Sequence, residues 1–142
     1  MRVKDIFNGF DEKQLFPPKA AVTDNTAQVS NIIDLAACSM ALLALTTGNL
    51  TDADATFAVL LEEGDDSALA DAATVDAADM IGTAALAGFT FADDNKCRKL
   101  GYIGSKRYIR MTVTPSNNTG NLFLAGIALL AKKTMATANP PT

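Results

Sequence analysis

The side chains best suited to chemistry in this chain are basic and aromatic, and they gather around the segment KLGYIGSKRYIRMTVTPSNNTG at residues 99–120. Proteins that hold single-stranded nucleic acid interleave such residues, because cations bind phosphates and rings stack on bases. Arginine and tyrosine also anchor many protein–protein interfaces. Seven candidates lie within thirteen residues: Arg98, Lys99, Tyr102, Lys106, Arg107, Tyr108 and Arg110.

The distribution of charge decides between these uses. Thirteen acidic and no basic residues lie between Lys19 and Lys96, whereas eight basic and no acidic residues follow Asp94. The net charge is −4, and an acidic middle repels phosphate, so we expect no nucleic-acid partner. Such a chain can pair its basic strands with acidic ones, present opposite charges to neighbouring subunits, or carry ordinary solvated loops. We therefore predict that the basic segment forms a protein interface or salt bridges inside the fold.

Two acidic turns are candidate calcium ligands. TDADAT at 51–56 and ADDN at 92–95 are rich in oxygen atoms, but neither has the ligand spacing or the glycine of an EF-hand loop. We expect polar turns there and predict no metal. One alternative stays open, a carbohydrate-binding sandwich with Ca²⁺ on Asp52, Asp54 or Asp93 and sugar stacking on Tyr102 or Tyr108.

No catalytic constellation is found in the sequence. The chain has no histidine, which removes the commonest general base and the histidine-based triads. The segment GYIGSK at 101–106 is too short for a phosphate-binding P-loop, and GxSxG is absent. We predict that the protein is not an enzyme and needs no cofactor. Cys38 and Cys97 lie far apart and outside any CxxC, so we expect two buried thiols rather than a disulfide or a metal pair.

Hydrophobic periodicity predicts an all-β protein. Ile109, Met111 and Val113 alternate with Tyr108, Arg110, Thr112 and Thr114, as in a half-buried strand, and residues 99–120 resemble a β-hairpin. Turn signals every 8–14 residues are typical of an antiparallel sandwich. LFLAGIALLA at 122–131 is apolar on both faces, which predicts a strand covered on both sides. The alanine-rich front half makes an all-α alternative possible on propensity; we predict one short helix between Ser67 and Gly82, capped by Asp65 or Asp66.

The ends of the chain are predicted to lie outside this sandwich. We assign residues 1–19 to an extended N-terminal arm, 20–133 to the β-sandwich and 134–142 to a C-terminal tail, because the prolines of FPPK block regular structure. The arm carries Phe7, Phe10 and Phe16, which need a surface to cover on this subunit or a neighbour. No signal peptide is recognised, and the longest apolar runs are too short for a membrane span, so we expect no membrane partner and folding in a cytoplasm.

Four blocks of the sequence resemble a family of small virion proteins of tailed bacteriophages. They lie within residues 20–131, and their order and spacing carry the resemblance: AAVTDNTAQVSNIID at 20–34, TGNLTDADATFAVLLEEGDDSALADA at 47–72, FADDNKCRKLGYIGSKRYIRMTVTPSNNTGN at 91–121, and the glycine-bearing segment 122–130. The chain departs from the family pattern at LLAKKTMA, where members usually read LLGHP.

The resemblance implies a jelly-roll-like antiparallel β-sandwich that serves as a capsid decoration, or cement, protein. Its partner would be the major capsid protein, which it would bind to stabilise the head, and it would self-associate as a trimer on the capsid surface of the virion after synthesis in the host cytoplasm. A head–tail or tail role is the alternative within the family. The family carries no catalytic residues to transfer to this chain.

Overall fold

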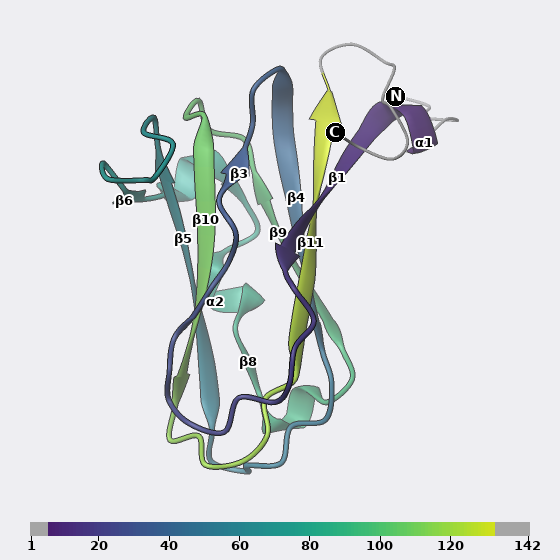
Figure 1. Ribbon diagram of the computed structural model, residues 1–142, viewed down its shortest axis with the longest axis vertical. Coiled ribbons are helices and arrows are strands. Elements are labelled where there is room, and N and C mark those ends of the chain that lie inside the picture. The colour runs from purple at the N-terminus through teal and green to yellow at the C-terminus, as the bar shows by residue number, and fades with distance from the viewer. Residues whose placement is uncertain (1–5, 133–142) are drawn as a thin grey trace.

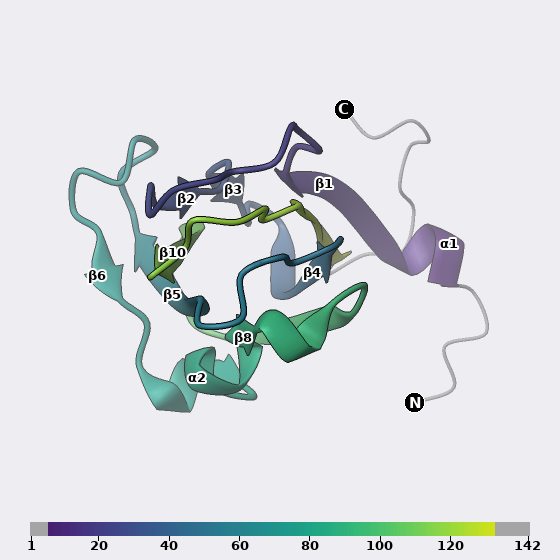
Figure 2. The same cartoon turned by 90° about the horizontal axis from the view of Figure 1, so that it is seen from below.

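The strands form two antiparallel sheets that pack face to face (Figures 1 and 2). The computed structural model describes residues 6–132. The first sheet has the order β1–β11–β4–β9–β7, and we call it the five-stranded sheet. Its strands are β1 (Phe10–Phe16), β11 (Leu124–Lys132), β4 (Cys38–Thr47), β9 (Cys97–Tyr102) and β7 (Met80–Ile81).

The second sheet has six strands, four of them in the order β2–β10–β5–β6, while β3 also pairs with β10 and β8 with β5. Its strands are β2 (Gln28–Val29), β10 (Tyr108–Ser116), β5 (Thr56–Gly64), β6 (Ala73–Thr74), β3 (Ile33–Asp34) and β8 (Phe89–Thr90). The helical elements are single turns: α1 (Ile6–Gly9), η1 (Ala77–Asp79), α2 (Ala84–Ala87) and η2 (Phe91–Asp93). The predicted all-β, jelly-roll-like sandwich is confirmed.

The core lies between the two sheets and is built from alternate residues of each long strand. On β10 the predicted inward set, Ile109, Met111 and Val113, is fully buried. On the facing sheet Leu43 and Leu130 are equally buried. Period-2 alternation thus places one apolar face of each sheet against the other, which is the main stabilising contact of a sandwich.

The expected hairpin at residues 99–120 does not form. β9 pairs with β4 and β7 in the five-stranded sheet, whereas β10 pairs with β5, β2 and β3 in the other sheet. Each of the two strands has one apolar face that must be buried in the core. The strands therefore lie in opposite sheets, and residues 103–107 cross the gap of about 10 Å between the layers.

The crossing is fixed by a buried tyrosine. Tyr102 is fully buried, and its hydroxyl donates to Glu63 Oε2 (2.5 Å) and accepts from the backbone N–H of Lys106 (3.1 Å). Gly104 packs so closely on this hydroxyl that a Cβ there would lie 2.5 Å from Tyr102 Oη. Burial, and then the hydrogen bond to the Glu63 carboxylate, raise the pKa of Tyr102, so the hydroxyl stays protonated.

We expect Tyr102→Phe to lower the free energy of unfolding by about 1–3 kcal/mol, because the part-buried Glu63 carboxylate and Lys106 N–H each lose a hydrogen bond. The matched control is Tyr108→Phe, since the ring of Tyr108 is only half-buried and its hydroxyl makes no hydrogen bond within residues 6–132. Urea unfolding of both variants measures the difference. Equal stabilities would show that the Tyr102 hydroxyl does not hold the crossing.

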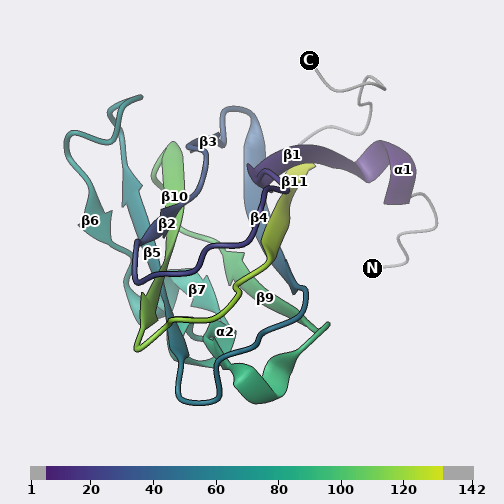
Figure 3. The ribbon, with the colours of Figure 1, turned by 60° about the horizontal axis from the view of Figure 1, so that its bottom comes forward.

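Residues 10–16, which the sequence places in an extended arm, form the edge strand β1 instead (Figure 3). β1 pairs antiparallel with β11 from Phe10 opposite Ala131 to Phe16 opposite Gly126. Leu15 and Phe16 are buried in the core, at 0% and 5% exposure. The reason is that the edge of β11 is free to pair with β1, and this pairing turns the apolar residues of β1 toward the core. Pro17 and Pro18 then end the strand, as expected from their missing N–H groups. Residues 1–5 and the predicted tail at 134–142 lie outside the described residues.

Two further local expectations differ from the structure. The span from Ser67 to Gly82 contains turns, the short strands β6 and β7 and the single turn η1, and the four-residue α2 begins after it. Asp66 does cap the first turn there, by accepting from the N–H groups of Ala68 and Ala70. Cys38 and Cys97 form no disulfide with each other, but the expectation of two buried thiols is wrong: Cys97 is exposed and Cys38 is only half-buried, since each begins a strand rather than filling its centre.

Candidate functional site

The most unusual surface of this sandwich is the side of the five-stranded sheet that faces away from the core. We call it the outer face. Leu129 lies opposite Leu42, and Ile127 lies opposite Ala44, so these two pairs of β11 and β4 residues project together. Inward residues of the same strands, such as Leu43 and Ala128, are fully buried. The residues that alternate with them along each strand therefore form the outer face. Its apolar residues and glycine are Phe10, Met40, Leu42, Ala44, Ile81, Gly101, Ile103, Ala125, Ile127, Leu129 and Ala131, and its polar residues include Glu12, Gln14 and Lys99.

Large apolar side chains on this face are open to solvent. Met40 is 46% exposed, Ile127 48% and Ile81 60%. The sequence predicts that segment 122–131 is covered on both sides, but within residues 6–132 only the inward side is covered. An apolar sheet face that its own chain leaves uncovered marks a contact surface for something else.

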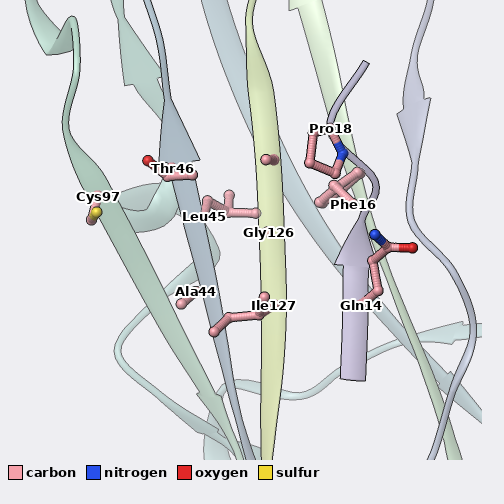
Figure 4. A pocket seen from close by; sticks show the side chains of 10 residues that line it. Gln14, Phe16, Pro18, Ala44, Leu45, Thr46, Cys97, Gly126 and Ile127 are labelled. Atoms are coloured by element: carbon pink, nitrogen blue, oxygen red, sulfur yellow. The ribbon is translucent and has the colours of Figure 1, made fainter. Parts of the chain in front are cut away.

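The outer face is hollowed in two places. One hollow of about 350 Å³ lies where β1, β11, β4 and β9 begin or end, and Figure 4 shows Ile127, Ala44, Phe16 and Cys97 around it. A second hollow of about 200 Å³ is lined by Phe10, Met40, Leu42, Ile81 and other residues at the opposite end of the sheet. Both linings are apolar, so they suit apolar side chains of a partner rather than a charged ligand.

Among the side chains that the structure describes, two charged ones stand on the outer face. Glu12 on β1 pairs in register with Leu129, and Lys99 on β9 pairs with Ala44, so the two flank the apolar centre from opposite sides. Both are exposed, and neither forms an ion pair within residues 6–132.

The opposite side of the sandwich has a different character. Arg110 and Glu62 are cross-strand neighbours there and form an ion pair of 2.8 Å. Thr112 and Thr114 continue the same row on β10, and the exposed apolar residues Leu60 on β5 and Val29 on β2 flank Thr112, so polar and apolar side chains are mixed on this side. The contrast identifies the outer face of the five-stranded sheet, and not the sandwich surface in general, as the candidate site.

Most of the basic residues predicted to form an interface instead pair with the acidic middle of their own chain. Arg107 makes two hydrogen bonds of 3.0 Å to the carboxylate of Asp34, and Lys106 Nζ lies 2.6 Å from Asp65. Arg98 pairs with Asp93 in the same way, and Arg110 with Glu62. The prediction of salt bridges inside the fold is confirmed for Arg98, Lys106, Arg107 and Arg110.

The remaining predicted interaction residues lie in different places. Tyr102 is buried in the core, and Tyr108 lies beneath the guanidinium of Arg107, which is 5.1 Å from its ring centre. Phe16 is buried, whereas Phe7 on α1 is 64% exposed. The two that belong to the outer face are Lys99 and Phe10.

The residues of the calcium and sugar alternative are not brought together. Asp52 accepts from the N–H and the hydroxyl of Thr119, and Asp93 caps η2 through the N–H of Thr90. Tyr108 lies at the other end of the long strands, eight residues or about 26 Å along β10 from the end beside Thr56. Among residues 6–132, no group of three or more potential ligands is placed to hold a metal ion.

These carboxylates give a prediction for the pH dependence of stability. Hydrogen bonds from Arg107 lower the pKa of Asp34, backbone N–H groups of Asp65 and Asp66 lower that of Asp71, and the Thr90 N–H, then Arg98, lower that of Asp93. A carboxyl whose folded pKa lies below its unfolded value of about 3.9 stabilises the fold above that pH. We therefore expect stability to fall as the pH is lowered from about 4 towards the folded pKa values.

Asp93→Asn should reduce this acid-dependent loss, because the amide cannot be protonated in that range. Asp76→Asn is the control, since the Asp76 side chain makes no hydrogen bond or ion pair within the described part of the chain. Urea midpoints at pH 7 and pH 3 give the comparison. If the urea midpoint of the wild type is the same at pH 7 and pH 3, the expectation is contradicted.

Among residues 6–132, no helix has the length and apolar character needed to cross a bilayer.

Comparisons with known proteins leave the chain without an assigned family. No family model matches it. No curated protein matches it. One similar solved structure contains the CBM22-1 and GH10 modules of the endo-1,4-β-D-xylanase 10B of Clostridium thermocellum, complexed with xylohexaose. It is 11% identical with a TM-score of 0.46, and the match covers 94% of this chain but only 28% of that one. This likeness carries no argument about what the present chain binds.

Proposed function

We propose that this chain is a structural protein of a tailed-bacteriophage virion, and that it decorates the head by binding the major capsid protein. Two supports are independent of each other. The first is the sequence resemblance over residues 20–131. The second, and the observation that carries the proposal, is the outer face of the five-stranded sheet, where Met40, Ile81 and Ile127 are left 46–60% exposed.

An apolar face of this kind fits a protein that works in an assembly. Soluble monomers rarely leave a large contiguous apolar patch in water, and such patches mark contact sites. A decoration protein needs a rigid body and a contact surface, and many equal contacts repeated over a closed shell add up through multivalency. The sandwich supplies the body, and the outer face supplies the surface.

The structure changes which residues we expect to make the contact. Because Arg98, Lys106, Arg107 and Arg110 are paired within the fold, opposed charges at the two ends of the chain are less available to a neighbour than the sequence suggests. Apolar contact supplies affinity in this proposal, and the unpaired charges of the outer face supply orientation. The trimer implied by the resemblance remains a prediction.

The proposal is tested by sedimenting purified protein with heads of the phage whose genome encodes the chain. We expect wild-type protein to pellet with heads and to raise the temperature at which they open. Protein that stays in the supernatant at micromolar concentration would overturn the proposal. Protein that pellets with isolated tails, and not with heads, would support the head–tail or tail alternative instead.

The role of an N-terminal arm needs a narrower variant than removal of residues 1–19, because that deletion also removes β1 and the buried Leu15. Deletion of residues 1–8 keeps the strand. Reduced head binding by this shorter deletion, with unchanged urea stability, would assign a contact to the segment that contains Phe7.

A further inference from the structure

We propose that the outer face of the five-stranded sheet is the contact between copies of this chain, in which Glu12 of one copy pairs with Lys99 of another. The inference rests on the proposed function, because it names the partner of the same assembly surface. It makes the decorating unit an oligomer that forms before it meets the head, so the outer face is used between copies and the rest of the oligomer's surface contacts the capsid protein.

The first argument is the charge of Lys99. Every other basic residue from Lys96 to Arg110 forms an ion pair with a carboxylate of its own chain. Lys99 forms none within residues 6–132, although its neighbours Arg98 and Lys96 both reach Asp93. The side chain points from β9 to the outer face, where the described chain offers it no nearby acid.

The second argument concerns Glu12, which is the one acid on this face within the described residues. It is also unpaired there, and it is out of reach of Lys99. Glu12 stands on β1, and β11 and β4 lie between it and β9. Three strand spacings separate the two charges by about 14 Å within one copy, which is too far for an ion pair. A second copy is needed to bring one beside the other.

The geometry of the sheet allows that pairing. Successive rows across the face read Glu12, Leu129, Leu42, Gly101 and then Gln14, Ile127, Ala44, Lys99. If a second copy packs on this face about a two-fold axis parallel to the strands, β1 of each copy lies over β9 of the other, with Glu12 one row from Lys99.

The centre of the contact is apolar and has room for a partner. Leu129, Leu42, Ile127 and Ala44 lie between the two charges, and the two hollows can receive side chains from the facing sheet. Five strands at about 4.8 Å by six residues at about 3.3 Å give a flat footprint of roughly 480 Å². The pleated side chains expose more than this flat area, so the face is of the order of the roughly 800 Å² that one partner contributes to a standard-size interface.

A second copy fits this face better than an unrelated protein, because the face is complementary to itself. It carries one acid and one base, each without a partner, at positions that a symmetric contact exchanges. A foreign partner would have to supply both charges, whereas a copy supplies both by construction.

A charge-swap experiment tests the inference on the full-length chain. The association constant of wild type, Glu12→Lys, Lys99→Glu and the double variant is measured by sedimentation equilibrium at low salt. We expect each single change to weaken association about tenfold or more, because it places like charges together, and the double variant to recover to within about threefold of wild type. The two single changes alter the net charge in opposite directions, so a shared loss cannot come from net charge. Circular dichroism verifies that each exposed variant remains folded.

The outcomes separate this inference from the proposed function. A wild type that stays monomeric at all concentrations, single variants without effect, or a double variant without recovery would each overturn the self-contact. In those cases head binding by the wild type would still support decoration, through contact of the outer face with the capsid protein. Self-association with charge-swap recovery but no head binding would support the inference and overturn the proposed function.

Discussion

Replacing Leu15 by alanine is expected to lower the free energy of unfolding by about 2–5 kcal/mol, which is a large share of the stability of a single small domain. The reason is that Leu15 is fully buried between the sheets, so alanine leaves a cavity and loses the transfer free energy of the removed atoms. The measurement is urea unfolding followed by far-ultraviolet circular dichroism.

The matched control is Gln14→Ala, one residue earlier on the same strand. Gln14 is exposed on the outer face, so its replacement should change the unfolding free energy by less than about 0.5 kcal/mol. The pair of variants separates an integrated strand from a loose arm. Two equal and small effects would contradict the placement of β1 in the sheet.

Replacing Ile127 by aspartate is expected to weaken assembly at least about a hundredfold without unfolding the single copy. Ile127 is 48% exposed at the centre of the outer face, so the new carboxylate is solvated in a free copy. Once the face is covered, the same carboxylate is buried without a partner, which costs about 3–5 kcal/mol and corresponds to more than a hundredfold in affinity. Light scattering across a concentration series measures self-association, and sedimentation with heads measures decoration.

Leu60→Asp is the control for this variant. Leu60 is 38% exposed at the middle of β5, on the outward side of the other sheet, and the substitution adds the same charge to a similar environment. We expect Leu60→Asp to assemble and to bind heads as the wild type does. If both variants lose self-association and head binding, net charge or folding is the cause. If both variants retain them equally, the outer face is not an assembly contact.

The long strands could be predicted from the sequence because their evidence is local. Alternation over Tyr108 to Thr114 gave the correct inward and outward sets of β10, and the apolar segment at 122–131 overlaps β11. Which strands pair is decided by contacts between distant residues. That is why residues 99–120 resembled a hairpin although their two strands belong to different sheets. It is also why the pairing of residues 10–16 with β11 could not be predicted.

The candidate site was predicted only in part. The division of charge along the chain indicated pairing between its acidic middle and basic end, but not that Arg107 would find Asp34 or that Lys99 would find no partner within the described residues. The sequence did contain a signal for the outer face, because segment 122–131 is apolar at both its odd and its even positions. It was interpreted as a strand covered within one chain, because a single sequence does not say whether the covering surface belongs to the same molecule or to another.

Alkylation of Cys97 tests most directly whether the outer face is covered in the assembled protein. Cys97 is exposed at the edge of the larger hollow beside Ile127, and Cys38→Ser leaves it as the only thiol. In this background, at a concentration where wild-type protein is assembled with itself or on heads, we expect the maleimide reaction at Cys97 to be at least tenfold slower than in the Ile127→Asp variant. Equal reaction rates in the two proteins would contradict a covered outer face and, with it, the proposed mode of assembly.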